Sequence, residues 1–209
     1  MPADPDVDIA VFARAPVAGQ AKTRLIPRLG AAGAARLQWQ LTERALLRVR
    51  AVRGARVALW TTADDADTRA LAATASATLR LQRGDDLGAR LANAFAETLD
   101  GQRPMLLIGT DCPAQTPADL EAALAALRRA DAVLQPAEDG GYVLIGMKQF
   151  HPALFEQVPW GSDAVLATTR SRAADRHLRL AELPMCWDLD RDEDLDRALA
   201  LGLVDLPLK

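Results

Sequence analysis

The residues of this sequence that could do chemistry are mainly carboxylates, lysine, arginine and glycine, and the first of them lie near the N-terminus. In the stretch "FARAPVAGQAKTRL", Lys22 and Arg24 follow closely behind an apolar run. A lysine binds phosphate as a point charge and an arginine as a bidentate fork, whereas the ordinary alternative for both is solvated surface charge. A Walker P-loop is excluded because Ala21 and Pro16 stand where that motif has glycines, and Gly19 alone is no dinucleotide fingerprint. We therefore expect a phosphate-binding loop of another type.

A second candidate, Asp111, follows the apolar run "MLLIG" within "GTDCP". If that run is a strand of a parallel sheet, the carboxylate faces the crevice in which such sheets bind ligands. Mg²⁺ takes one or two protein carboxylates and completes its octahedron with phosphate oxygens and water. The alternative is structural, because an aspartate is also a common turn residue ahead of a proline such as Pro113.

The acidic stretch "CWDLDRDEDLDRAL" near the C-terminus has a structural and a functional interpretation. Structurally, Asp190 would cap a helix, Glu193 would complete its capping box, and the acids of the first turn would suit the helix dipole. Asp188 is not explained in this way. It alternates with Asp190 around Leu189, so in an extended segment both carboxylates would point to one side. There, one of them could meet a metal ion held by Asp111.

Several other mechanisms are not supported by the sequence. His151 and His177 lack the partners of a nucleophilic or metal site, and the charge of Asp111 would raise the thiol pKa of its neighbour Cys112. Cys112 and Cys186 fit no metal-ligand or redox spacing, which favours a reducing cytoplasm. The formal net charge of −3 gives no electrostatic case for nucleic acid. No apolar run approaches the roughly 18 residues of a membrane span.

Hydrophobic periodicity indicates the elements that position these residues. Apolar, β-branched runs alternate with helical spacing, which predicts an α/β fold with a mostly parallel central sheet flanked by helices, formed by residues 1–209 as one domain. In such sheets ligands bind beyond the carboxyl ends of the strands. The predicted strands are 7–13, 56–62, 77–82 and 105–111, then two strands around a Gly-Gly turn within 131–147. The predicted helices are about 33–52, a short one after Asp65, one within 84–99 and one at 116–130.

Local signals refine three helices. Thr116 is placed to cap its helix, with Asp119 as the capping-box partner. Ser162 is the candidate cap of a helix that follows "PWG". In the helix at 33–52, Arg44 and Arg48 fall on faces other than the apolar one.

Six motifs, in this order along the chain, resemble those of a known family. They are "FARAPVAGQAKTRL", "GDDLGARL", "LLIGTDCP", "PAEDGGYVLIG", "PWGSDAVLATT" and "WDLDRDEDL". The sequence resembles the radical-SAM/selenodomain-associated glycosyltransferases from Asp8 to about Leu201. It is similar, more loosely, to 2-phospho-L-lactate guanylyltransferase and the molybdenum-cofactor guanylyltransferase. The resemblance implies the GT-A, Rossmann-like fold of the nucleotide-diphospho-sugar transferases.

The resemblance also implies roles for individual residues. The residues that would bind the nucleotide are Arg14, Gly19, Lys22, Arg24 and Asp86. Those that would contact donor or acceptor are Gly140, Gly141 and Tyr142. The catalytic residues would be Asp111, Lys22 and Asp139.

A divalent metal, Mg²⁺ or Mn²⁺, is implied as well, with Asp111, Asp188 and Asp190 as its ligands. Gly109 stands where the Asp-x-Asp motif of glycosyltransferases has its first aspartate. Metal binding would therefore depend on Asp188 or Asp190 in addition to Asp111.

Three functions remain open at this point. The family implies glycosyl transfer from a nucleotide-diphospho-sugar to a small-molecule acceptor. Lys22 and Arg24 would also suit a triphosphate whose pyrophosphate leaves, so the alternative is nucleotidyl transfer of the guanylyltransferase kind, which needs no protein nucleophile. The third is a non-catalytic nucleotide-binding partner of a biosynthetic enzyme, prompted by the missing first aspartate.

Overall fold

Seven strands form one sheet in the computed structural model, which describes residues 6–205. Their order across the sheet is β3-β2-β1-β4-β6-β5-β7. All neighbouring strands run parallel except β6, which is antiparallel to β4 and β5. The strands are β1 Val7–Ala13, β2 Ala55–Thr61, β3 Thr78–Leu81, β4 Met105–Gly109, β5 Ala132–Pro136, β6 Tyr142–Met147 and β7 Leu180–Glu182. The expected α/β fold with a mostly parallel sheet is confirmed.

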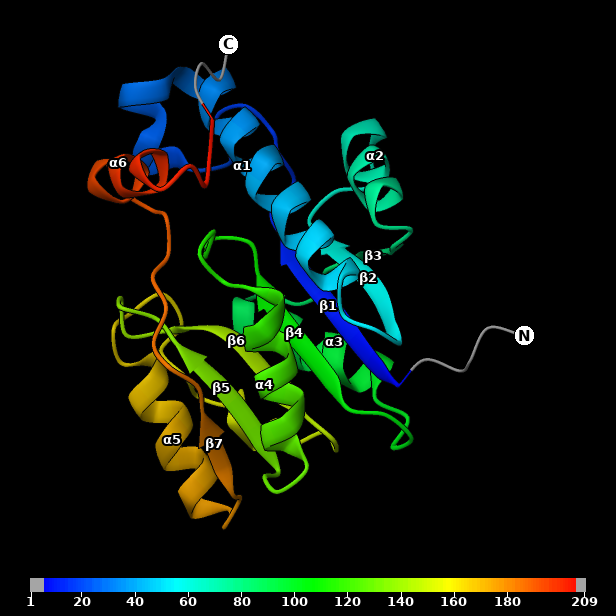
Figure 1. Cartoon of the computed structure of the whole chain (residues 1–209). Helices are drawn as coiled ribbons and strands as arrows, with labels where there is room; N and C mark the ends of the chain where they lie inside the picture. Colours follow the sequence, from blue (N-terminus) through cyan, green and yellow to red (C-terminus); the bar gives the residue numbers. More distant parts are fainter. Residues whose placement is uncertain (1–5, 206–209) are drawn as a thin grey trace.

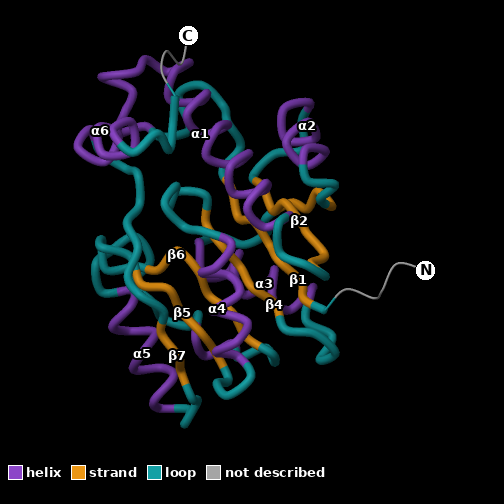
Figure 2. Tube along the Cα trace, viewed as in Figure 1, coloured by secondary structure: helices purple, strands orange, loops and turns teal. Residues whose placement is uncertain are grey.

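Helices cover both faces of this sheet (Figure 1; Figure 2). The α-helices are α1 Ile26–Arg50, α2 Ala66–Thr74, α3 Leu87–Thr98, α4 Pro117–Leu127, α5 Val165–Asp175 and α6 Asp192–Ala200, with 3-10 turns η1 Thr23–Leu25 and η2 Pro152–Leu154. α1, α2 and α4 pack on one face, and α3 and α5 on the other. In β1, Ile9 and Val11 join the first core while Ala10 and Phe12 join the second, as the alternation of a strand requires.

The C-terminal segment leaves the sheet and packs on α1. Trp187, Leu189 and Leu195 of this segment form an apolar cluster with Leu37 and Leu41 of α1. This cluster holds α6 and the preceding strand-like residues at the carboxyl edge of β1 and β4, on the side of the sheet where the N-terminal loop also ends (Figure 1).

The sequence predicted the N-terminal cap of α4 correctly, whereas α1 and α5 begin at other residues than expected. Thr116 and Asp119 form the expected capping box. α1 begins at Ile26 rather than near Gly33, because the chain continues through a kink at Gly30, whose φ is 70°. α5 begins only at Val165, so Ser162 is not its cap; the Ser162 hydroxyl instead accepts a hydrogen bond from Ala164 N at 3.3 Å.

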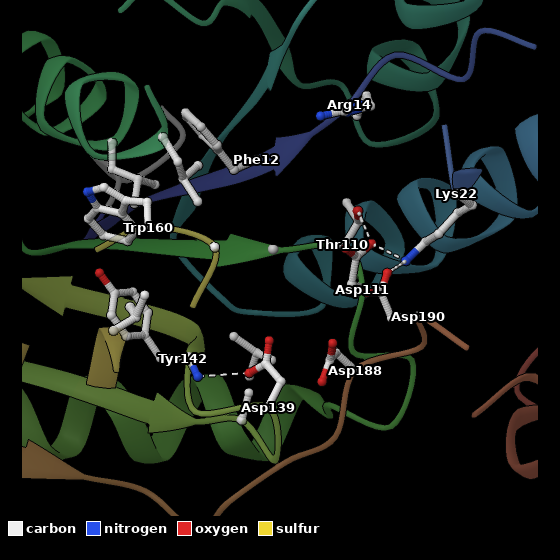
Figure 3. Close-up of a pocket in the computed structure, with 18 of the residues that line it drawn as sticks. Phe12, Arg14, Lys22, Thr110, Asp111, Asp139, Tyr142, Trp160, Asp188 and Asp190 are labelled. Atoms are coloured by element: carbon white, nitrogen blue, oxygen red, sulfur yellow. Dashed lines mark hydrogen bonds and ion pairs between the residues drawn. The ribbon is translucent and has the colours of Figure 1, made fainter. Parts of the chain in front are cut away.

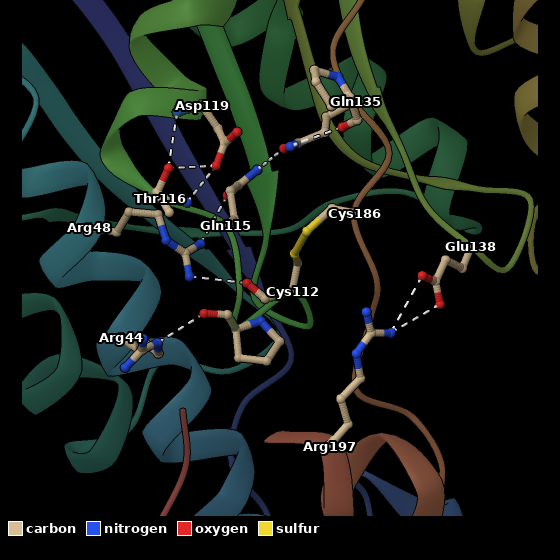
Figure 4. The surroundings of a disulfide bond; sticks show 12 residues. Arg44, Arg48, Cys112, Gln115, Thr116, Asp119, Gln135, Glu138, Cys186 and Arg197 are labelled. Atoms are coloured by element: carbon tan, nitrogen blue, oxygen red, sulfur yellow. Dashed lines mark hydrogen bonds and ion pairs between the residues drawn. A yellow bond between two sulfur atoms is a disulfide. The ribbon is translucent and has the colours of Figure 1, made fainter. Parts of the chain in front are cut away.

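Two arginines of α1 hold the loop that follows β4 (Figure 4). Arg48 is buried and donates to Gln115 Oε1 at 2.9 Å and to Cys112 O at 3.1 Å, while Arg44 donates to Pro113 O at 3.0 Å. Burial, and after it the charge of Arg44, lowers the pKa of Arg48 to about 10. Arg48 therefore lies on the buried side of α1, contrary to the expectation from the helical spacing, and both arginines bind carbonyl groups of the loop.

A disulfide joins Cys112 to Cys186, 74 residues apart in sequence (Figure 4). The sequence spacing, which matched no metal-ligand or redox motif, did not indicate this bond. Sequence spacing could not show the pairing, because the "GTDCP" loop and the chain beyond β7 become neighbours only through the order of the strands. Within residues 6–205, no helix is both long and apolar enough to cross a membrane.

Candidate functional site

A cavity of about 700 Å³ opens at the carboxyl ends of β1 and β4, on the face of the sheet that carries α3 and α5 (Figure 3). The loop at 14–24, Asp111 and the Gly-Gly turn all reach it, as the sequence predicted. One half of the cavity is lined by charged side chains, including Lys22, Asp111 and Asp190. The other half is lined by apolar and aromatic ones, including Tyr142 and Trp160.

Lys22 is the central cation of the charged half. Its side chain is only 3% exposed, and its Nζ lies 2.8 Å from Asp111 Oδ1 and 4.0 Å from Asp190 Oδ1. The ammonium also donates to Leu189 O at 2.5 Å. Lys22 has a left-handed backbone with φ 47°, which a residue other than glycine adopts at a cost of about 1 kcal/mol. The surface-charge interpretation is therefore wrong for Lys22, which bridges two carboxylate-bearing segments.

The other cations of the loop are more exposed. Arg24 pairs with Asp190, so the pair places one guanidinium and one carboxylate at the mouth of the cavity. Arg14 is exposed, lines the cavity and donates to Gln20 O at 2.9 Å. Gly19 lies in the same turn with φ 81° but does not line the cavity, so its role is to let the loop turn.

Asp111 directly follows the end of β4 and is held from several sides. Thr110 donates through its hydroxyl to Asp111 Oδ1 at 3.3 Å, and Gln38 from α1 donates to that hydroxyl at 3.1 Å. Leu189 N donates to Asp111 O at 2.7 Å. The side chain is half exposed and turns toward Lys22, so the carboxylate faces the cavity and does not cap the turn before Pro113.

Asp188 and Asp190 alternate with buried neighbours, as the sequence suggested. Trp187 and Leu189 are buried in the cluster on α1, while both aspartates face the cavity. The capping interpretation of this stretch was off by one residue. Arg191 is the N-cap of α6, and Asp194 accepts its backbone N–H at 2.8 Å, so Asp190 and Glu193 do not form the cap.

Asp188 lies near other carboxylates and has no cationic partner among the described residues. Burial raises the pKa of Asp188 to about 6, and the charges of Asp139, Asp190 and Asp111 add to that effect. Within residues 6–205 Asp188 makes no ion pair, whereas Asp111 and Asp190 share Lys22. A region with excess negative charge and free carboxylate oxygens fits a hard divalent cation. No three acidic, histidine or cysteine side chains in the described part of the chain converge as a ready-made metal site.

The Gly-Gly turn shapes the floor between the two halves. Gly141 donates its N–H to Asp139 Oδ1 at 2.8 Å, and both residues line the cavity. Gly140 does not line it. Gly140 has φ 87°, and a Cβ there would lie 2.3 Å from Asp163 O, so this glycine lets the turn pack against the "PWGSD" segment.

Three motifs meet in the apolar half. The Tyr142 and Trp160 rings lie edge to face, 6.2 Å apart. A Cβ on Gly88, in "GDDLG", would lie 2.1 Å from Trp160 Nε1, so only glycine fits under the indole. Asp86 of the same motif does not line the cavity; it caps α3 by accepting from Ala89 N at 2.7 Å. The structure thus places Trp160 in the cavity wall.

Some lining residues were not singled out from the sequence. They include Gln38, Asp163 and Arg191. Gln38 lies on the buried face of α1, and a glutamine on an otherwise apolar helical face is a signal that could have been used.

Comparison with known proteins gives this geometry a family context. The model of the family "Uncharacterized protein conserved in bacteria (DUF2064)" matches residues 45–162. A solved structure from Desulfovibrio desulfuricans G20, described as a "putative nucleotide-diphospho-sugar transferase", is 30% identical over 93% of this chain and 86% of that one, with a TM-score of 0.85. No curated protein matches the chain.

Two less similar structures share the fold. CMP:2-keto-3-deoxy-manno-octonic acid synthetase complexed with CTP is 13% identical over 94% of this chain and 98% of that one, with a TM-score of 0.62. Glucosyl-3-phosphoglycerate synthase from Mycobacterium tuberculosis, with Mn²⁺, UDP and glucosyl-3-phosphoglycerate, is 11% identical over 95% of this chain and 77% of that one, with a TM-score of 0.55. The structural neighbours are thus transferases of the nucleotide-sugar type. By the extent of the family match and of the Desulfovibrio similarity, the chain belongs to the family described as "Uncharacterized protein conserved in bacteria (DUF2064)".

Proposed function

We propose that this protein is a metal-dependent glycosyltransferase that uses a nucleotide-diphospho-sugar donor. The observation that carries the proposal is that Asp111 and Asp190 pair with Lys22 and that Asp188 lines the same cavity, at the edge of the sheet where α/β folds bind ligands. The cluster opens into a cavity large enough for a sugar and an acceptor. The similarity to the Desulfovibrio protein supports the same choice.

Asp111 and Asp188, with Asp190 beside them, would hold Mg²⁺ or Mn²⁺. A divalent ion bound there would neutralise the charge that the departing diphosphate gains. Asp188 is the best placed for this role, because its carboxylate has no cationic partner of its own among the described residues. The Mn²⁺ and UDP in the mycobacterial glucosyl-3-phosphoglycerate synthase support a divalent metal in this fold.

The three cationic side chains of the N-terminal loop would have different roles. Among residues 6–205, Arg14 donates only to a backbone carbonyl, and it is exposed in the cavity, so its remaining N–H groups can bind phosphate oxygens. Lys22 uses its ammonium to hold Asp111 and Leu189 O, so it positions the carboxylates and adds positive charge beside the phosphates. Arg24 would do the same for Asp190.

Asp139 would accept the proton of the acceptor. It lies between the charged and the apolar half, and the N–H of Gly141 fixes one of its oxygens. In glycosyl transfer the acceptor oxygen bonds to the anomeric carbon, the bond from that carbon to the diphosphate breaks, and the hydroxyl proton passes to Asp139. The nucleoside diphosphate leaves.

Nucleotidyl transfer is the second candidate, and one observation favours it. The fold is shared with the CTP-bound synthetase, and the cation-rich loop would also suit a triphosphate. In that case the acceptor attacks the α-phosphorus and pyrophosphate leaves. A non-catalytic nucleotide-binding partner is a third possibility, which sustained product formation by the purified protein would remove.

A thermal-shift panel in Mn²⁺ separates these functions. It compares GTP, CTP, UTP and ATP with UDP-, GDP- and ADP-sugars. A ligand at a hundred times its dissociation constant adds about 2.7 kcal/mol to the free energy of unfolding, which gives a clear shift. Selective stabilisation by a nucleotide sugar is the expected result. Stabilisation by one triphosphate and by none of the sugars would replace the glycosyltransferase proposal with nucleotidyl transfer.

A further inference from the structure

The apolar half of the cavity has a composition that restricts what it can bind. Its lining comes from β1, α3, β4, β6 and the segment before α5, and includes Phe12, Leu87, Leu91, Leu107, Ile145, Tyr142 and Trp160. The cavity's cations are Arg14, Lys22, Arg24 and Arg191, from the N-terminal loop and the segment after Asp190. Figure 3 shows Lys22 at the opposite end from Trp160, and Arg14 beyond Phe12.

Two acids border the apolar half. Asp139 lies on its border, and Asp163 lies in the same lining next to Val165. Neither makes an ion pair among residues 6–205. A phosphate or carboxylate bound against Trp160 would lose its hydration and lie near two unpaired negative charges, with Lys22 at the opposite end of the cavity, so an anionic group is disfavoured there.

This half also offers few hydrogen-bond partners to a sugar. Each buried hydroxyl group of a sugar needs a hydrogen-bond partner. The Tyr142 hydroxyl is itself buried, and burial raises the Tyr142 pKa, an effect that the nearby Thr169 hydroxyl only partly offsets. Trp160 Nε1 faces the backbone of Gly88. The rings and the aliphatic side chains therefore provide contact area with few hydrogen bonds.

The wall is built to keep its shape. Trp160 rests on Gly88 and against the edge of Tyr142, and Gly140 locks the turn below onto Asp163. Leu91 and Phe12 behind them are buried in the core that α3 and α5 share with the sheet. A preformed apolar pocket of this kind favours ligands with rigid apolar bodies.

We propose that this half is the acceptor subsite, and that the acceptor is an uncharged alcohol or phenol with an apolar body. The assignment of this half to the acceptor rests on the proposed transfer reaction. The chemical class of the bound ligand follows from the residues that line this half. The apolar body would lie against Trp160 and Tyr142, with its hydroxyl group toward Asp139. The reacting oxygen would then lie between the apolar wall and the carboxylate cluster, where the donor's diphosphate is expected.

The test measures binding with the full chain and needs no turnover. The probes are 2-naphthol and 2-naphthyl phosphate, which share one apolar body and differ in charge, and binding is followed by calorimetry. We expect 2-naphthol to bind at least tenfold more tightly than 2-naphthyl phosphate. Equal or tighter binding of the phosphate would overturn the proposal.

Two leucine variants locate the binding. Leu87 lines the cavity at the first turn of α3 and is 45% exposed, so Leu87→Lys leaves the core intact. It should weaken 2-naphthol binding by about tenfold and reduce the preference over 2-naphthyl phosphate. Leu81→Lys is the matched control, because Leu81 is 44% exposed on β3 and does not line the cavity. Equal effects of the two variants, or none from Leu87→Lys, would overturn the assignment.

A competition arm separates an acceptor site from a donor site. The nucleotide sugar or triphosphate that stabilises the protein most in the panel is added at saturation, and 2-naphthol is titrated again. Unchanged or tighter binding of 2-naphthol is expected if the two occupy neighbouring subsites. Competition would overturn the acceptor assignment and place the donor in the apolar half. If no nucleotide binds, the proposed function fails while the naphthol comparison still tests the class of ligand.

Discussion

Replacing Lys22 with alanine should destabilise the protein, and the structure sets the size of the effect. The Lys22 side chain is 3% exposed and bridges Asp111, which is 50% exposed, and Asp190, which is 35% exposed. Removing one partner of a fully buried ion pair costs about 3–5 kcal/mol. Because water reaches both carboxylates, we expect a smaller loss, about 2 kcal/mol of unfolding free energy.

The sequence alone would lead to the opposite expectation, that Lys22→Ala weakens nucleotide binding with stability nearly intact, as for an exposed residue. Burial of the ammonium overturns that view. In a chain of 209 residues a loss of about 2 kcal/mol lowers the melting temperature by roughly 4–8 °C. Lys148→Ala is the control, since Lys148 makes no ion pair in the described part of the chain.

The assay is a thermal melt by circular dichroism, with and without Mn²⁺. A divalent ion can replace the charge of the ammonium between the carboxylates, so Mn²⁺ should raise the melting temperature of Lys22→Ala more than that of the wild type. An unchanged melting temperature without metal, together with normal folding, would show that the Lys22 bridge carries no stability. The account of Lys22 as a positioning residue would then be refuted.

Three further expectations concern the same site. Asp111→Asn should lower the transfer rate by about a hundredfold or more while the fold is kept, because it removes a charge next to the diphosphate; steady-state rates check this, and near-normal turnover would contradict the metal assignment. Gly140→Ala should lower the free energy of unfolding, measured with urea, by about 2–4 kcal/mol, because its Cβ would lie 2.3 Å from Asp163 O. Gly19→Ala is the control: its Cβ meets nothing within 4 Å, so it should lower the free energy of unfolding by only about 1 kcal/mol through backbone strain. Mn²⁺ affinity, measured by calorimetry, should fall as the pH drops from 7 to 5, because a proton binds Asp188, whose pKa in the folded protein is raised to about 6, and competes with the metal; an affinity independent of pH would remove Asp188 from the ligands.

The sheet was predictable because its strands carry strong local patterns. β1 is buried at every residue and is apolar except for Asp8, and β5 and β6 are marked by the Gly-Gly turn between them. The edge strand β7 has three residues and half-exposed side chains, so its signal was weak. The α4 cap was correct because Thr116 and Asp119 interact within one turn.

The contacts that make the site were not predictable, because they join residues far apart in sequence. The burial of Lys22 depends on a carbonyl at Leu189, and the fit of Trp160 depends on the absence of a side chain at Gly88. The Cys112–Cys186 disulfide is of the same kind. In each case the partners lie far apart in the sequence, and only the folded chain brings them together.

The C-terminal segment explains how a site without the first aspartate of an Asp-x-Asp motif could still hold a metal. Gly109 stands at that position in β4, and the nearest group to a Cβ there would be Val143 O at 4.0 Å. The extended residues 187–190 run past this point, tied to it by Leu189 N donating to Asp111 O and by the disulfide. They place Asp188 among the other carboxylates, which raise its pKa. If Asp188 compensates for the missing first aspartate, Gly109→Asp should add a carboxylate beside Asp111 and tighten Mn²⁺ binding to an Asp188→Asn variant. Calorimetry that shows no gain in Mn²⁺ affinity would mean that positions 109 and 188 are not equivalent.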